Sequence, residues 1–452
     1  MDISSLVKSQ HHHFSMGKTL DIERRKKLLS QLYVTIQRKE KELSEALYKD
    51  LGKDEVESYL SEIGIVLSEL RYTIKHLYRW TKRQKVKTPL SLAPAQSYYI
   101  YVPYGVTLIL SPWNYPFQLT MIPLIGAIAA GNTAIIKPSA KSAHTSAIMD
   151  EIVTQVFDPR DAKVVMAHQG NYDEILHQPY NYIFFTGSTT VGKKIMKRAS
   201  EDLIPLTLEL GGKSPTIVDE SASIALAAKR IVFGKMLNAG QTCVAPDFII
   251  VHKQVKEQLL VALQQEFEQA MRDHTSYPSI ISDDHYSRLL HLLEGEHLYY
   301  SGPHDPIKRK IHPTILDKVS LDSPIMKEEI FGPLLPVLSY SSWSEVETLL
   351  SQTKHPLACY VFSERRDRQL WFERTYQFGG GCINDTLVHV SSTHLPFGGV
   401  GHSGMGSYHG KKTFETFSHA KSIVHSSTRI DVPIRYRPYT TLKKALIRRF
   451  LR

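Results

Sequence analysis

The stretch VTLILSPWNYPFQLTMIPLIGAIAAGNTAIIKPSAK (106–141) contains the pattern that decides the fold. Its two apolar, β-branched runs, 106–110 and 133–137, enclose an apolar segment that ends at the turn signal Gly131-Asn132. We therefore expect a strand, a buried helix, a turn and a second strand in succession. This βαβ order is typical of two parallel strands joined by a crossover helix.

Strand-like runs alternate with helical patterns further along the chain, and two amphipathic helical segments precede them. The expected strands are 163–167, 182–186, 207–210, 215–219 and 247–252; the expected helices are 21–51, 54–80, 222–239 and a segment that ends near 272; and 85–104 is an expected arm or hairpin. This alternation predicts an α/β fold with doubly wound parallel sheets. At 452 residues, the chain is long enough for two or three domains.

The positive charge of the chain is concentrated at its C-terminus. Residues 421–452 contain nine Lys or Arg and one acid, which is +8 of the net +10. The body is therefore nearly neutral, which argues against a nucleic-acid-binding surface. In 440–452, Leu442, Ala445, Leu446 and Phe450 share one helical face among basic residues that include Arg452, a pattern that fits peripheral contact with an anionic membrane. The alternative is a solvated tail.

The three cysteines, Cys243, Cys359 and Cys382, are too few and too widely spaced for a disulfide framework or a CxxC metal site. We therefore predict no metal and a reducing, cytoplasmic location. The N-terminus lacks the pattern of a secretory signal, and the apolar segment 119–136 is interrupted by Pro123, Gly126 and Gly131, so no transmembrane helix is expected.

The loops after parallel strands are where such sheets bind ligands, so their residues are candidates for chemistry. FTGSTTVG (185–192) places Gly187 and Gly192 before a helix, where unpaired N–H groups would face a pyrophosphate; the alternative is an ordinary helix cap. Asn114, beside Trp113, could donate an N–H to an oxyanion, or could form a turn before Pro116.

Cys243 and Glu209 are candidates for nucleophilic and acid–base chemistry. Small neighbours in NAGQTCVAP (238–246) leave the Cys243 sulfur approachable, whereas Cys359 and Cys382 are expected to be small buried hydrophobes. Glu209 ends an apolar strand, where burial would raise the pKa of a carboxyl group, unless it forms a structural ion pair. Glu329, in EEIFGP, could bind a sugar or could belong to a helix end and turn.

Six motifs, SPWNYP, GSTTVG, LELGGKSP, NAGQTCVAP, EEIFGP and LPFGGVG, occur in this order along the chain. Their order and spacing resemble the NAD(P)-dependent aldehyde dehydrogenases, from about Leu20 to about Ser426. The run FGGVGHSGMGSYHGKKTFETFSH (397–419) resembles the class-3 type, which includes fatty and aromatic aldehyde dehydrogenases, and the chain also resembles bacterial relatives that oxidise long polyene aldehydes.

The resemblance implies a domain division and an oligomeric state. A Rossmann-like NAD(P)-binding domain would comprise 1–84 and 104–208, and an α/β catalytic domain 209–385. A small β arm, 85–103 and 411–426, would serve dimerisation, and 427–452 would be the basic tail.

The resemblance also implies residue roles. Cys243 would be the nucleophile, Glu209 the general base, and Asn114 with the Cys243 N–H the oxyanion hole. Cofactor-binding roles would fall to Trp113, Lys137 (adenosine ribose), Gly187, Ser188 (pyrophosphate), Gly192, Glu329 (nicotinamide ribose) and Phe331, with Asn384 near the site.

The implied reaction is oxidation of a long-chain or apolar aldehyde to a carboxylic acid through a thiohemiacetal and a thioester, with NAD or NADP as cofactor. Glu209 disfavours a CoA-acylating enzyme, and the intact Cys243, Glu209 and Asn114 argue against a catalytically silent binding protein. Many relatives carry a glutamate where this chain has Ala140. Because alanine does not repel a 2′-phosphate, we expect NADP to be used as well as NAD.

Overall fold

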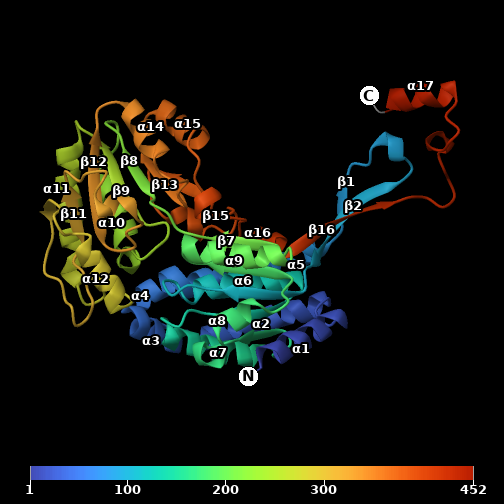
Figure 1. Ribbon diagram of the computed structural model, residues 1–452, viewed down its shortest axis with the longest axis horizontal. Coiled ribbons are helices and arrows are strands. Elements are labelled where there is room, and N and C mark those ends of the chain that lie inside the picture. The colour runs from blue at the N-terminus through green and yellow to red at the C-terminus, as the bar shows by residue number, and fades with distance from the viewer. Residues whose placement is uncertain (1, 451–452) are drawn as a thin grey trace.

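The computed structural model describes residues 2–450, whose strands form a six-stranded sheet, a seven-stranded sheet and a three-stranded arm (Figure 1). Within each large sheet all strand pairs are parallel except at one edge. The expectation of an α/β fold with parallel sheets is confirmed.

The six-stranded sheet has the order β15-β7-β6-β3-β4-β5, and only β15 is antiparallel to its neighbour. Its strands are β3 (Val106–Leu110), β4 (Thr133–Lys137), β5 (Ala162–Val164), β6 (Tyr182–Thr186), β7 (Leu206–Glu209) and β15 (Gly404–Met405). Each expected run forms a strand here, although β5 is shorter than 163–167. The helix, turn and strand expected within 106–141 are all present.

Helices cover both faces of this sheet because its central strands are apolar on both sides. Ile109 and Ile136 pack with one set of helices, whereas Leu108 and Ile135 pack with the other. The first set is α2 (Ile22–Arg38), α5 (Gly64–Thr81), α6 (Gln118–Ala130) and α7 (Ala143–Val156), and the second is α1 (Ile3–Ser15) and α9 (Thr189–Glu201). The short α8 (Tyr172–Leu176) precedes β6.

The two expected N-terminal helices are each divided. The segment 21–51 forms α2 and α3 (Glu40–Leu51), which are separated at Lys39. The segment 54–80 forms α4 (Glu55–Ser58), a π-helical turn at Tyr59–Ile63, and α5. A π-helical turn inserts an extra residue into a helix and is frequent at functional sites.

The seven-stranded sheet has the order β10-β11-β12-β9-β8-β13-β14, with β10 antiparallel at its edge. Its strands are β8 (Pro215–Val218), β9 (Phe248–His252), β10 (Leu298–Tyr300), β11 (Thr314–Asp317), β12 (Leu334–Tyr340), β13 (Ala358–Phe362) and β14 (Gly380–Ile383). One face packs on α10 (Ile224–Met236) and α11 (Lys256–Ala270), and the other on α12 (Asp283–His291), α14 (Trp343–Ser351) and α15 (Arg366–Arg374). The short α13 (Pro324–Lys327) lies before β12.

The arm consists of β1 (Gln84–Val86), β2 (Gln96–Pro103) and β16 (Ser418–His425), all antiparallel, and it projects from the body (Figure 1). The expected hairpin is therefore present. The segment 411–426 is only partly arm, because Lys411–Thr416 forms α16, which packs on α6 and buries Phe414 against Trp80.

The basic tail forms α17 (Thr441–Phe450) near the tip of the arm (Figure 1). The expected apolar face is divided: Leu442 is exposed, whereas Leu446, with Leu90 and Ala93 of the arm, lines a cavity of about 780 Å³. The Phe450 side chain and Arg452 lie outside the described residues. In residues 2–450, no helix is both long and apolar enough to cross a bilayer.

Candidate active site

Cys243 lies between α10 and β9, directly after a tight irregular turn. In this turn Asn238 and Ala239 adopt left-handed backbone angles, φ 52° and 50°. Gly240 also has positive φ, and a Cβ there would collide with the Gly332 carbonyl oxygen, so glycine is required at this position. The turn brings the half-buried Cys243 thiol to the wall of a cavity.

The cavity beside Cys243 has a volume of about 170 Å³ and a mainly apolar lining. Its apolar residues include Ile65, Leu119, Phe233, Val390 and Phe397. The polar residues Ser61, Gln118, Thr242, Ser391 and His409 complete part of the wall. This lining favours a hydrocarbon chain over a polar molecule.

The pKa of the Cys243 thiol is raised above its usual value. Burial contributes most to this shift, and the carboxyl groups of Glu329 and Glu209 raise the pKa further when they are ionised. Both carboxyl groups are thus close enough to act on the thiol electrostatically.

The expectation that Cys359 and Cys382 are small buried residues is confirmed, and the Cys382 Sγ lies 3.5 Å from His389 Nδ1.

Glu209 is the last residue of β7, between Thr186 of β6 and Gly404 of β15. Only 2% of Glu209 is exposed, and neither carboxyl oxygen has a hydrogen-bond partner within residues 2–450. Burial therefore raises the pKa of Glu209 well above its usual value, as the sequence predicted. The alternative of a structural ion pair is wrong, because no cation contacts this carboxyl group in the described chain.

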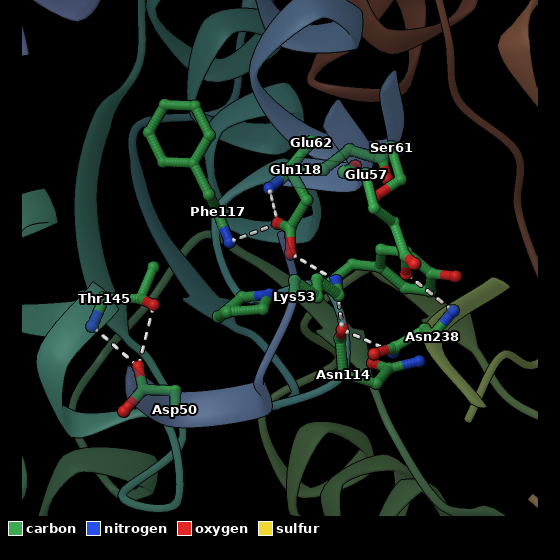
Figure 2. Close-up of polar contacts among 12 residues, drawn as sticks. Asp50, Lys53, Glu57, Ser61, Glu62, Asn114, Phe117, Gln118, Thr145 and Asn238 are labelled. Carbon is green, nitrogen blue, oxygen red and sulfur yellow. Dashed lines mark hydrogen bonds and ion pairs between the residues drawn. The ribbon is translucent and has the colours of Figure 1, made fainter. Parts of the chain in front are cut away.

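Asn114 lies in the loop between β3 and α6 and is almost completely buried. Its Nδ2 donates to the Gln241 carbonyl at 3.0 Å, two residues before Cys243. The backbone carbonyl of Asn114 accepts from Lys53 Nζ at 3.0 Å and from Asn238 Nδ2 at 2.8 Å (Figure 2). One Nδ2 hydrogen remains for a ligand, since an amide nitrogen carries two.

Glu329 and Gly211 are in contact, and both line a cavity of about 430 Å³ that extends to Thr189 at the start of α9. A Cβ on Gly211 would collide with Glu329 Oε2, so glycine makes room for the carboxyl group. Burial, followed by the charge of Asp247, raises the pKa of Glu329 to about 8. Glu329 Oε1 is buried without a partner among residues 2–450 and suits a ribose hydroxyl donor.

Phe331 and Trp113 lie edge to face, with ring centroids 5.5 Å apart. Phe331 has φ 52°, which turns the chain just after Glu329. Trp113 also lies edge to face with His285 at 5.2 Å. These contacts join the loop after β3 to the segment that carries Glu329, so both sheets contribute to one site.

Lys137 ends β4, and Ala140 is exposed three residues later. Burial lowers the Lys137 pKa, and its Nζ contacts the Pro138 carbonyl at 3.1 Å. The ammonium group keeps further donor positions free for a ligand.

The expectation of free N–H groups at Gly187 and Gly192 is wrong. The Gly187 N–H donates to the Glu209 carbonyl at 3.0 Å, and the Gly192 N–H, already inside α9, donates to the Ser188 carbonyl at 2.9 Å. Ser188 is the N-cap and accepts from Val191 N at 3.4 Å. Both glycines instead permit close packing, because a Cβ would meet Phe185 at Gly187 and Leu210 at Gly192.

Asn384 lies in a corner after β14 with φ 57°. Its side chain accepts from Ser363 N at 2.8 Å and donates to the Ser363 carbonyl at 3.2 Å. Both contacts tie β14 to the end of β13.

The described residues include no group of three or more His, Cys, Asp or Glu that could hold a metal ion.

Sequence reasoning missed the polar residues that surround Asn114, namely Lys53, Glu57, Glu62, Asn238 and Gln241. One signal was present: Glu62 falls on the same helical face as Val66 and Leu70, where a carboxyl group is costly to bury. Lys53 gave no such signal, because it follows the helix-ending Gly52 outside any periodic pattern.

The chain is similar to known aldehyde dehydrogenases over most of its length. The sequence profile of the aldehyde dehydrogenase family matches residues 1–423. The 4,4'-diaponeurosporen-aldehyde dehydrogenase of Staphylococcus aureus is 47% identical over 432 residues, 94% of each chain. The dimeric NADP-preferring aldehyde dehydrogenase of Rattus norvegicus is 40% identical over 429 residues, 94% of this chain and 95% of the relative.

Solved structures show the same fold. A substrate-bound state of Staphylococcus aureus AldH superposes with a TM-score of 0.97, 45% identity and complete coverage of both chains. An NAD⁺ complex of a Bacillus cereus aldehyde dehydrogenase superposes with a TM-score of 0.85 at 26% identity, covering 94% of this chain and 89% of the other. The chain therefore belongs to the aldehyde dehydrogenase family, as a class-3-type member, and is an NAD(P)-dependent aldehyde oxidoreductase.

Proposed function

We propose that Cys243 is the nucleophile, Glu209 the general base, and Asn114 an oxyanion donor in the oxidation of a long-chain or apolar aldehyde to its carboxylic acid. One observation carries the proposal: the Cys243 thiol lines an apolar cavity, and Glu209 is a buried carboxyl group whose two oxygens have no hydrogen-bond partner among residues 2–450. Thiolate sulfur is the nucleophile in such a reaction, and a buried carboxyl group with a raised pKa suits a general base that acts on water.

The proposed reaction has two stages. Cys243 Sγ, after its proton is released to solvent, would attack the aldehyde carbon and form a tetrahedral thiohemiacetal, whose oxyanion would accept hydrogen bonds from the Asn114 side-chain N–H and the Cys243 backbone N–H. The nicotinamide ring of the bound cofactor supplies a hydride acceptor. Glu209 would then remove a proton from water, which attacks the remaining thioester and releases the acid and the free thiol.

The cofactor is proposed to bind between the two sheets. The six-stranded sheet, with residues 1–84 and 104–208, would form the cofactor domain, and residues 209–385 the catalytic domain. Glu329 would accept from the nicotinamide ribose, and the cavity from Glu329 to Thr189 has room for the adjoining part of the cofactor. The remaining contacts are proposed for Lys137 at the adenosine ribose, Ser188 at the pyrophosphate, and Trp113 and Phe331 near the nicotinamide.

The long-chain substrate is supported by the cavity lining and by the Staphylococcus aureus relative, whose name specifies 4,4'-diaponeurosporen-aldehyde. The arm supports a homodimer, because β2 and β16 project from the body and the rat relative is named as dimeric. The three free cysteines support a cytoplasmic location.

The tail is proposed to touch an anionic membrane surface. Lys444, Arg448 and Arg449 of α17 are exposed near the tip of the arm, and the exposed Leu442 supplies an apolar contact. Each basic residue near such a surface contributes about 1 kcal/mol.

Aldehyde chain length should determine catalytic efficiency. Because the cavity wall is mainly apolar, kcat/KM should rise from short to long aldehydes when NAD(P)H formation is followed at 340 nm. The Cys243→Ser variant should lose at least about 100-fold of kcat with every substrate. Equal efficiency across the series would contradict the apolar substrate, and an active serine variant would contradict the nucleophile.

The Glu209→Gln variant should separate the two stages. The first turnover should still give a burst of NAD(P)H, whereas steady-state turnover should fall by about 10² to 10⁴-fold because water is no longer activated. Since the wild-type carboxyl pKa is raised, wild-type turnover should decline as pH falls through it, and the variant should lack that limb. A dependence of wild-type turnover on added CoA would instead indicate an acyl-CoA product.

NADP should be accepted together with NAD because no carboxylate occupies position 140. The ratio of kcat/KM values for NAD and NADP should stay below about 100-fold, or 2.7 kcal/mol. The Ala140→Glu variant should lower efficiency with NADP more than with NAD, because a carboxylate repels the 2′-phosphate. The neutral Ala140→Gln variant is the size-matched control, and an equal loss in both variants would exclude a charge effect.

A chain that ends at Tyr439 should lose binding to vesicles that contain anionic lipid, as measured by co-sedimentation. Its mass in light scattering should remain that of a dimer, because the truncation leaves the arm strands intact. Equal sedimentation of the full-length and shortened chains would remove the membrane proposal.

A further inference from the structure

A fully buried ion pair lies next to the candidate active site. Lys53 Nζ and Glu62 Oε1 are 2.7 Å apart, and both side chains are completely shielded from solvent. Lys53 follows α3, and Glu62 lies in the π-helical turn before α5. Burying two charges is costly, and apolar replacements are often as stable, so the pair is weak evidence for a purely stabilising role.

Among residues 2–450, the Lys53 ammonium has one further hydrogen bond and one cation–π contact, and both are with the loop that carries Asn114. The ammonium donates to the Asn114 backbone carbonyl at 3.0 Å (Figure 2). It also lies 4.0 Å from the centre of the Tyr115 ring. Lys53 thus binds two consecutive residues of the loop, one through a hydrogen bond and one through a cation–π contact.

Glu62 holds the other end of the same loop. Its Oε2 accepts from the backbone N–H groups of Phe117 at 2.9 Å and Gln118 at 3.0 Å, at the start of α6 (Figure 2). The start of a helix has unpaired N–H groups and favours a negative charge. The ion pair therefore holds the loop 114–118 at four of its residues, namely Asn114, Tyr115, Phe117 and Gln118.

The loop is in turn joined to the segment before Cys243. Asn114 Nδ2 donates to the Gln241 carbonyl at 3.0 Å, and Tyr115 Oη lies 2.6 Å from Thr242 Oγ1. Asn238 Nδ2 bridges the carbonyls of Asn114 and Gln241 at 2.8 and 3.1 Å. A shift of the loop would therefore change the placement of the Asn114 amide relative to the thiol.

We propose that Lys53, through its pair with Glu62, is a positioning residue that holds the Asn114 amide in register with the Cys243 thiol. This inference rests on the proposed role of Asn114 as an oxyanion donor. A displacement of about 1 Å in a reacting geometry can cost about 100-fold in rate. The contribution of Lys53 should therefore appear in kcat and hardly in substrate binding.

The Lys53→Met variant should lower kcat by about 10 to 100-fold, with KM changed less than about threefold. The NAD(P)H burst should slow as well, because an oxyanion forms in both stages of the reaction. This result differs from Glu209→Gln, in which the burst remains. A change in KM alone would overturn the proposal.

Two further variants separate positioning from folding. Lys53→Met/Glu62→Gln removes both charges of the pair and should melt near the wild-type temperature, yet its kcat should stay low because Asn114 still lacks its ammonium donor. Recovery of wild-type kcat would overturn the proposal. As a matched control, Arg25→Met removes another buried cation, one bound to the carbonyls of Leu20 and Ala129, and should lower the melting temperature while leaving kcat unchanged.

A double-mutant cycle tests whether Lys53 acts through Asn114. Asn114→Ala keeps the backbone carbonyl that Lys53 binds but removes the amide, and should lower kcat by about 10² to 10³-fold. In that background Lys53→Met should lower kcat by less than about threefold more. If the kcat losses of Lys53→Met and Asn114→Ala multiply in the double variant, Lys53 acts independently of Asn114, and the positioning role alone is overturned. An unchanged kcat in Asn114→Ala would overturn both the oxyanion role and this inference.

Discussion

The candidate site depends on a seam of hydrogen bonds between the loop after β3 and the turn before β9. Asn114 of the first loop and Asn238 of the second both donate to the Gln241 carbonyl, and Asn238 also binds the Asn114 carbonyl. All three residues are buried, so breaking one contact would leave polar groups without partners in a place that water does not reach. The two sheets are therefore joined rigidly at the point where the thiol lies.

Buried carboxyl groups around this seam divide into two kinds. Burial raises the pKa of Glu62, but its ammonium partner and two backbone donors lower it, and these three contacts fix the geometry of the carboxyl group. Glu209 and Glu329 each keep at least one buried oxygen without a partner in the described chain, and burial raises their pKa values. An uncompensated buried carboxyl group destabilises the fold, which makes these two residues candidates for proton transfer and ligand binding.

Much of the fold could be predicted because the strands carry their own signal. Runs such as 106–110 and 182–186 are apolar on both faces, which only a strand covered by helices on both sides satisfies. The prediction of free N–H groups after β6 was wrong for a local reason. Gly187 and Gly192 suggested free N–H groups, but their N–H groups pair with Glu209 and Ser188, and the missing side chains serve packing against Phe185 and Leu210.

The sequence by itself determined the alternation of strands and helices, the motifs that mark Cys243, Glu209 and Asn114 as candidates, and the family they resemble, because residue type and local spacing are properties of neighbouring positions. Only the tertiary structure decided that the Lys53–Glu62 pair holds the Asn114 loop and that Glu329 fills the space left by Gly211. These partners are distant in the chain, and they meet because long-range packing of helices and sheets brings them together.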